Sequence, residues 1–265
     1  MDTAQLLFRA PKGKKIPEFL DKVQSYLAAL LKNGQIISGY TVTKVTGGYL
    51  VTASLPESDA LADRFANKWV RTRLRDLAAA GVARPKVTRL GTDPDSRPPC
   101  RCRKQPFLIL FTTCVHAEPP LRCGACFGPV ALYKVPATDG VESYQDVLSW
   151  EDTYQAMDWL FIGSGAGERF AHGQLARFDS ALSSDGRELA RNLERRVRVP
   201  VYYNLSKYFG RSDRAERERK CPSCGKRWRR NEPLHGIFDF QCERCRLLSS
   251  VAFDVRVVRD SGGSR

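Results

Sequence analysis

The stretch that decides how the C-terminal part of the chain folds is CPSCGKRWRRNEPLHGIFDFQCERC, residues 221–245. Two C-x-x-C pairs, Cys221 with Cys224 and Cys242 with Cys245, are separated here by seventeen residues. Each pair places two thiolates on one tight turn, and a hairpin between the pairs brings the turns together. Tetrahedral zinc needs four such ligands at about 2.3 Å. The segment predicts a structural zinc ribbon, with a redox dithiol as the alternative, and leaves His235 surplus and exposed.

A second group of cysteines lies upstream. Cys123 and Cys126 form another C-x-x-C pair, and Cys100 and Cys102 form a C-x-C pair. A C-x-C pair can still present two sulfurs to one metal, so we expect these four residues to hold a second zinc ion. Cys114 and His116 are alternative ligands. The competing interpretation is that some of these cysteines are small buried apolar residues, which fits Cys114 best.

Neither zinc site has the pattern of a catalytic centre. A catalytic zinc keeps one position open for water and usually recruits His or Glu, whereas four thiolates close the site. The chain has three histidines and no H-E-x-x-H motif, and its GSGAG stretch at 163–167 lacks the Lys-Ser/Thr of a phosphate-binding loop. We therefore expect a protein that is not an enzyme.

Cations surround the ribbon cysteines. The whole chain carries 43 basic and 29 acidic residues, a formal net charge of +14, which suggests a polyanionic partner. The ribbon would present phosphate-binding cations together with Trp228, which either stacks on an unpaired base or covers the small ribbon core. The expected nucleic-acid-binding residues here are Lys226, Arg227, Trp228, Arg229, Arg230, Arg244 and Arg246.

The first part of the chain, residues 1–95, has the pattern of a ferredoxin-like α/β sandwich. Strand-forming runs are expected at 4–10, in a hairpin around 37–55 and at 84–90, with helices beginning at Pro17 and covering 59–79. The resulting order β-α-β-β-α-β is that of a split β-α-β fold. The chain as a whole is predicted to be α+β.

The second predicted helix carries a row of cations. Arg64, Lys68, Arg71 and Arg75 recur at i, i+4, i+7 and i+11, so they would share one helical face. Such a row either follows a phosphate backbone or is an ordinary solvated face. Trp69 on the same helix is expected in the core.

The remaining chain divides into a central domain, residues 96–205, and a basic C-terminal ribbon domain, residues 206–265. The central domain combines the second zinc site with helices expected at 141–162 and 185–197. Four acids of the first helix are expected to be solvated: Asp146, Glu151, Asp152 and Asp158. Residues 211–220 read as an exposed charged linker or helix.

The sequence shows no secretory signal and no apolar run long enough to cross a membrane. We therefore expect a cytoplasmic protein. In reducing cytosol, nine cysteines are better explained by metal binding than by disulfides.

Several separated motifs resemble those of an uncharacterised bacterial family of zinc-ribbon proteins, whose nucleic-acid-binding role is itself inferred from the ribbon. The motifs are PPLRCGACFGPVALYKVP (119–136), VPVYYNL (199–205), CPSCGKRW (221–228) and FDFQCERCRLLSS (238–250). The cysteines that match the family pattern are Cys123, Cys126, Cys221, Cys224, Cys242 and Cys245.

Two functions follow as hypotheses. The first is a zinc-ribbon protein that binds nucleic acid, RNA or DNA, through its basic surfaces. The second is a protein-binding adaptor, such as an immunity-type protein that neutralises a toxin-like or acidic protein partner. Salt-dependent affinity for nucleic acid favours the first, and stoichiometric association with one protein favours the second.

Overall fold

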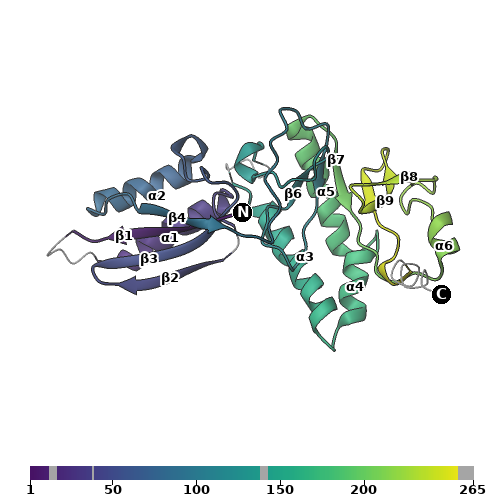
Figure 1. Cartoon of the computed structure of the whole chain (residues 1–265), viewed down its shortest axis with the longest axis horizontal. Coiled ribbons are helices and arrows are strands. Elements are labelled where there is room, and N and C mark those ends of the chain that lie inside the picture. The colour runs from purple at the N-terminus through teal and green to yellow at the C-terminus, as the bar shows by residue number, and fades with distance from the viewer. Residues whose placement is uncertain (12–16, 38, 138–142, 256–265) are drawn as a thin grey trace. The chain divides into compact units, whose positions relative to one another are not determined.

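The computed structural model describes residues 1–11, 17–37, 39–137 and 143–255 (Figure 1). Its residues group into two compact units. Unit 1 comprises Met1–Arg101, Val115–Leu121 and Gly128–Leu148. Unit 2 comprises Cys102–Cys114, Arg122–Phe127 and the chain from Ser149 onward. The three-domain division with boundaries at 95 and 205 stays a prediction.

Unit 1 contains an antiparallel sheet in the order β2-β3-β1-β4. The predicted β-α-β-β-α-β order is confirmed, and this strand order is that of a ferredoxin-like sandwich. Its elements are β1 (Asp2–Arg9), α1 (Phe19–Lys32), β2 (Tyr40–Val45), β3 (Gly48–Leu55), α2 (Lys68–Ala79) and β4 (Lys86–Thr92).

The core of unit 1 follows from the alternation of side chains along β1 and β3. Ala4, Leu6 and Phe8 are buried on one face of β1, because successive strand residues point to opposite sides. Val51 pairs with Leu6 in register and is buried beside it. Helix α1 packs its stripe of Val23, Tyr26, Leu27 and Leu30 into the same core.

The second predicted helix is shorter than expected. A separate 3-10 turn, η1, covers Asp63–Phe65, and α2 begins only at Lys68. Asn67 ends the interruption, since its side chain accepts a hydrogen bond from the backbone N–H of Val70 at 3.0 Å and caps the helix. Arg64 is therefore not on α2. Trp69 was predicted to be core, and this is wrong: it is 44% exposed.

Unit 2 is built on a six-stranded sheet in the order β6-β5-β7-β10-β9-β8. Strands β5, β7 and β10 run parallel, while β9 pairs antiparallel with β10 and with β8. The strands are β5 (Leu108–Leu110), β6 (Leu121–Cys123), β7 (Val201–Asn204), β8 (Arg229–Leu234), β9 (Phe238–Cys242) and β10 (Leu247–Ser249). The sheet thus continues across the predicted boundary at residue 205.

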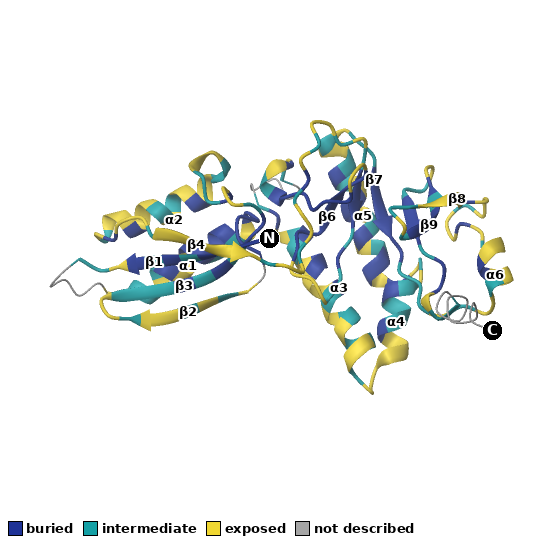
Figure 2. Ribbon diagram, in the orientation of Figure 1, coloured by how far each residue is buried: buried dark blue, intermediate teal, exposed yellow. Residues whose placement is uncertain are grey.

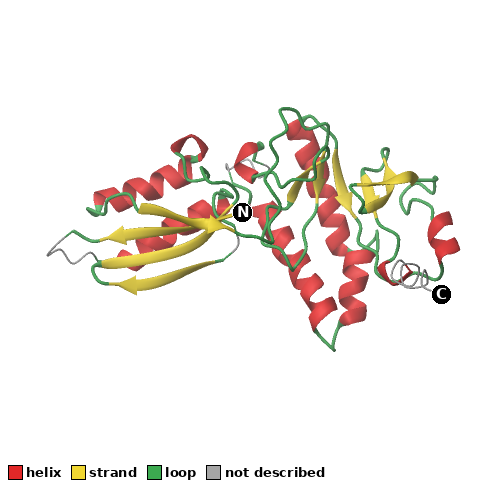
Figure 3. Cartoon of the chain, viewed as in Figure 1, coloured by secondary structure: helices red, strands yellow, loops and turns green. Residues whose placement is uncertain are grey.

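The larger helices are α3 (Gln145–Gly163), α4 (Glu168–Ala176) and α5 (Ala181–Val197), and a short turn η2 covers Leu132–Lys134 (Figure 3). Helix α5 begins one turn earlier than predicted, because the Ser180 side chain accepts from the backbone N–H of Ser183. Helix α4 was not predicted.

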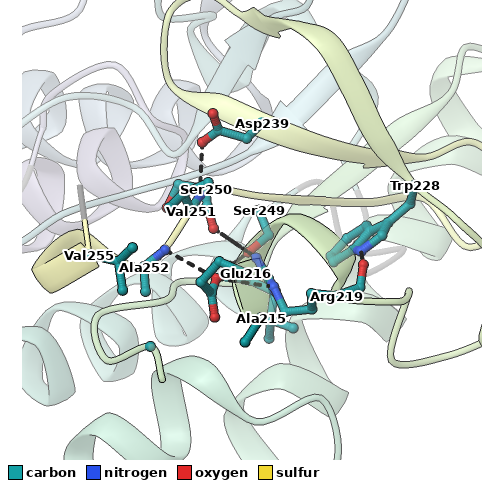
Figure 4. Close-up of polar contacts among 12 residues, drawn as sticks. Ala215, Glu216, Arg219, Trp228, Asp239, Ser249, Ser250, Val251, Ala252 and Val255 are labelled. Carbon is teal, nitrogen blue, oxygen red and sulfur yellow. Dashed lines mark hydrogen bonds and ion pairs between the residues drawn. The ribbon is translucent and has the colours of Figure 1, made fainter. Parts of the chain in front are cut away.

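Residues 211–220 are mostly exposed, and of the two predicted alternatives, a charged linker or a helix, the structure shows the helix. They contain helix α6 (Asp213–Glu218), whose Glu216 is 4% exposed and accepts from the backbone N–H of Ala252 at 3.2 Å (Figure 4). Arg219 follows the helix, pairs with Glu216 at 3.3 Å and donates to the Ser250 carbonyl at 2.8 Å. These contacts anchor the segment to unit 2 through Glu216 and Arg219, whereas most of its other side chains are exposed.

Candidate metal centres

Two groups of four cysteines lie together in the described part of the chain. In each group the four sulfur atoms lie within 4.8 Å of one another. The groups are Cys221, Cys224, Cys242 and Cys245, and Cys100, Cys102, Cys123 and Cys126. Both are the ligand sets predicted from the sequence, and a thiolate tetrad of this size fits one tetrahedral metal ion.

The turns that carry the C-x-x-C pairs share one backbone conformation. The residue after the second cysteine is left-handed in all three: Gly225 at φ 67°, Arg246 at φ 53° and Phe127 at φ 59°. In two of them the same residue donates its N–H to the carbonyl of the first cysteine, Gly225 to Cys221 at 2.9 Å and Phe127 to Cys123 at 2.8 Å. The Cys123–Cys126 turn is therefore the same kind of knuckle as the Cys221–Cys224 turn.

Gly124 is required by close packing inside its knuckle. Its N–H donates to the Phe107 carbonyl at 2.8 Å, and a Cβ placed on it would lie 2.3 Å from the Phe107 ring. No side chain fits there without moving a partly buried ring. This explains a glycine between the two cysteines.

The thiols of the C-terminal cluster differ in their surroundings. Burial raises the pKa of Cys242 to about 12 and also raises the pKa of Cys221. Backbone N–H donation from Lys226 lowers the pKa of Cys224 to about 7. A bound dication favours the thiolate form of all four, so metal binding would release protons from the buried pair.

His235 was predicted to be exposed, and this is wrong. Its ring stacks on Phe127 with centroids 5.1 Å apart, and its Nε2 lies 2.9 Å from the Gly124 carbonyl oxygen. The β8–β9 turn thereby rests on the Cys123–Cys126 knuckle. His235 is a contact between the two cysteine-rich segments and belongs to neither cluster.

Cys114 and His116, the alternative ligands, belong to neither cluster. The Cys114 backbone N–H donates to Asp158 at 2.8 Å. Burial, with the nearby Asp158 carboxylate, raises the pKa of the Cys114 thiol to about 11. Cys114 is therefore a protonated thiol, and Asp158 is held by protein contacts and is not simply solvated.

Glu151 is the other acid that departs from expectation. It is 7% exposed, accepts from Thr112 at 3.2 Å and lies 3.4 Å from the Gln155 amide. Burial raises its pKa to about 8, opposed by the Thr112 hydrogen bond and the Arg122 charge. The prediction that these helix acids are solvated is wrong for this residue.

Comparison with known proteins divides the chain into three matched segments. Family models described as domains of unknown function match residues 1–91 (DUF8589), 102–206 (DUF2310) and 210–255 (DUF8594). An uncharacterized protein of Haemophilus influenzae is 33% identical over 146 residues, which cover 55% of this chain and 71% of that protein. The chain belongs to the DUF2310 family.

A second uncharacterized Haemophilus influenzae protein is 29% identical over 207 residues, 78% of this chain and 79% of its own length. A solved structure from Deinococcus radiodurans covers 37% of this chain and 98% of its own at 16% identity, with a TM-score of 0.28. That score is too low to carry an argument. Among the described helices of this DUF2310 member, none is long and apolar enough to span a membrane.

The predicted base-stacking residue of this DUF2310 member is not accessible. Trp228 is 3% exposed, and its Nε1 donates to the Arg219 carbonyl at 3.0 Å (Figure 4). Its ring also packs on Phe240. The Arg219 guanidinium lies 4.3 Å from the Phe240 ring centre. Trp228 therefore covers the core of the C-terminal strands, which was the alternative interpretation.

The predicted ribbon cations fall into two groups. Lys226, Arg227 and Arg244 are exposed, and no ion pair to them occurs within the described residues. Arg230 bonds the Gln241 side chain, and Arg246 pairs with Glu194 at 3.0 Å. Arg229 is only partly exposed. Three of the six cations are therefore free to meet a ligand.

A cleft of about 1110 Å³ adjoins the C-terminal cluster. Its walls include Cys224 and Cys245 and one face of α5, and the arginines that line it are Arg187, Arg191, Arg195, Arg244 and Arg246. Sequence reasoning missed the three α5 arginines, because they lie in a segment with more acids than bases. Their spacing of four residues was the available signal.

In unit 1, the predicted row of cations is only partly realised. Lys68, Arg71 and Arg75 lie on α2 and line one cleft, whereas Arg64 precedes the helix and pairs with Asp59. The row of four on one helix face is therefore wrong for Arg64.

Proposed function

We propose that this chain is a zinc-binding protein whose C-terminal zinc ribbon helps to form a nucleic-acid-binding cleft. Four thiolates close enough to one another to coordinate one ion tetrahedrally are the ligand set of structural zinc. The closed shell leaves the ion no open position, so its role is to fix the knuckles that carry Lys226, Arg227 and Arg244.

The observation that supports the proposal is the row of arginines that lines the cleft beside Cys224 and Cys245. Arg187, Arg191 and Arg195 follow one another at four-residue steps along α5, which is about 6 Å of helix rise per step. Arg244 adds a cation from the C-terminal cysteine-rich segment. Glu188 and Glu243 also line the cleft, and Glu194 there is paired with Arg246, so a net positive charge remains.

The contacts available in the cleft favour the phosphate backbone over the bases. Arg187 lies 3.7 Å from the centre of the Phe178 ring, so that ring face is already occupied. Trp228 is buried and offers no stacking surface. Binding through phosphates alone is strongly salt-dependent and weakly selective for sequence.

The test is a salt titration with labelled single-stranded RNA, single-stranded DNA and duplex DNA. Arg191→Gln, Arg195→Gln and Arg244→Gln together should lower the slope of log affinity against log salt by roughly 2 to 3, at about 0.7–0.9 per phosphate. The matched control replaces three exposed arginines outside the cleft, Arg169, Arg211 and Arg214, by Gln.

Equal slopes for the two triple variants, or no binding at low salt, would overturn the nucleic-acid proposal. The protein-binding function would then be the better-supported proposal. Trp159 and Ile162, one helical turn apart at the end of α3, are 56% and 59% exposed, and Phe170 on α4 is 60% exposed. Exposed apolar residues of this size favour a protein contact. Replacing Trp159 and Phe170 by Lys should then abolish binding to that protein.

A further inference from the structure

The helix-facing side of the unit 1 sheet is left open over β4. Leu6 on β1 is fully buried, but Val87, its register partner on β4, is 47% exposed. Directly opposed residues point to the same face of a sheet, so both side chains face the helix layer. Every residue of β4 is exposed, while β1 beside it is buried along its helix-facing side (Figure 2).

This opening forms a cleft of about 680 Å³ between α2 and β4. Small-molecule sites typically measure about 300–1,000 Å³ and are lined mainly by apolar side chains. Here the apolar lining comes from α2, from the sheet and from the loops before and after α2. It includes Leu6, Leu61, Val70, Leu74, Val82 and Val87.

Cations border this apolar interior. Lys68, Arg71 and Arg75 come from successive turns of α2, and Arg84 comes from the loop before β4. The acid that lines the cleft among the described residues is Asp63, and it is paired with Arg84 at 2.7 Å. The helix cations therefore give the opening an excess of positive charge.

Two polar groups at the cleft are already positioned. Gln35 is 1% exposed, donates to the Ala60 carbonyl at 2.7 Å and accepts from the Asn33 amide at 2.8 Å. The Tyr26 side chain is 7% exposed and also lines the cleft. The interior is thus preorganised, which reduces the entropy cost of binding.

We propose that this cleft binds a small amphipathic anion, a carboxylate or phosphate carried on a short apolar body. The apolar body would replace water against Leu6 and Val87, and the anionic head would lie between Arg71 and Arg75. A nucleic-acid backbone would use the cations but leave the apolar interior hydrated. This site is independent of the nucleic-acid proposal, which concerns unit 2.

The test uses the full chain and four probes: the fluorescent anion anilinonaphthalene sulfonate, octanoate, octyl phosphate and the neutral octanol. We expect octanoate or octyl phosphate to displace the fluorescent anion, with octanol at least about tenfold weaker because it lacks the charged head. Comparison of octanoate with octyl phosphate identifies the preferred head group.

Two variants separate the parts of the site. Arg71→Gln with Arg75→Gln should weaken the anions by about tenfold and leave octanol unchanged. Val87→Trp should fill the cleft and abolish binding of every probe. The matched controls are Arg73→Gln, on the same helix, and Leu90→Trp, 54% exposed on the same strand, neither of which lines the cleft.

The proposal would be overturned if octanoate still displaced the fluorescent anion from Val87→Trp. It would also be overturned if the Arg71 and Arg75 changes left the affinity for the anions unchanged. If the wild type did not bind octanoate and the arginine variant lost binding to an oligonucleotide, the α2 cations would instead be a nucleic-acid site. If Val87→Trp does not fold, the exposed Arg71 and Arg75 changes still decide the question, because they leave the core intact.

Discussion

His235 stacks on Phe127, with ring centroids 5.1 Å apart and an interplanar angle of 27°. The two residues belong to different cysteine-rich segments: His235 lies in the turn between β8 and β9, and Phe127 is the left-handed residue that closes the Cys123–Cys126 knuckle. The imidazole also reaches the Gly124 carbonyl of that knuckle. Disordering of the β8–β9 turn should therefore also destabilise the Cys123–Cys126 knuckle, and the reverse should hold.

His235→Ala should speed metal release from the Cys100–Cys126 cluster by about tenfold. The change removes a ring contact and a hydrogen bond, each contributing about 0.5–1.5 kcal/mol. The measurement is the rate of metal transfer to a chromophoric chelator. Glu232→Ala, an exposed change in the same hairpin, is the control, and equal rates for both would show that the contact is not coupled to the metal.

Elemental analysis should find two zinc ions per chain. Cys245→Ser and Cys126→Ser should each remove one, because each breaks a different tetrad. Cys114→Ser should leave the content at two, since Cys114 lies outside both clusters. A wild-type value near one, reduced only by Cys245→Ser, would show that the Cys100–Cys126 group holds no zinc.

Trp228→Ala should destabilise unit 2 by about 3–5 kcal/mol, the usual cost of removing a buried aromatic ring. Trp228 packs on Phe240 and donates a hydrogen bond to the Arg219 carbonyl. The change therefore leaves a cavity and an unpaired acceptor. Denaturant unfolding measures this. The exposed neighbour is the control: Arg227→Ala should leave stability unchanged and reduce only nucleic-acid affinity. A stable Trp228→Ala protein would contradict the burial.

Glu151 should make stability depend on pH. Its pKa is raised from about 4.5 to about 8, so the folded chain retains a proton that the unfolded chain loses in this range. Stability should therefore fall as pH rises from 4.5 to 8, by at most about 1.4 kcal/mol per pH unit.

Glu151→Gln should remove this decline and make the protein more stable than wild type at pH 8. The groups that face Glu151 are Thr112, Gln155, Asp152 and Arg122, of which only Asp152 and Arg122 carry charge. The control is Glu168→Gln, an exposed acid on α4 that does not act on Glu151. Equal pH profiles for wild type and Glu151→Gln would show that the carboxyl is not the titrating group.

Periodicity predicted unit 1 well, because long strands and an amphipathic α1 carry strong two- and 3.6-residue signals. Cysteine spacing predicted both tetrads for a similar reason, since metal geometry leaves few alternatives. The parallel pairing of β5, β7 and β10 was not predicted: β5 and β10 have three residues each, too few to show a period. Contacts formed only on folding, such as Glu151 with Thr112 or Trp228 with Arg219, leave no local pattern.

The position of β7 between β5 and β10 has a consequence for how the chain tolerates shortening. A chain ending after Asn204 would keep β7 but lose its neighbour, and a row of backbone N–H and C=O groups would face solvent. Such an open edge is a template for pairing with other chains. The chain after Asn204 thus also prevents self-association, because its β10 covers the edge of β7. A truncated chain should aggregate even though β7 itself is intact.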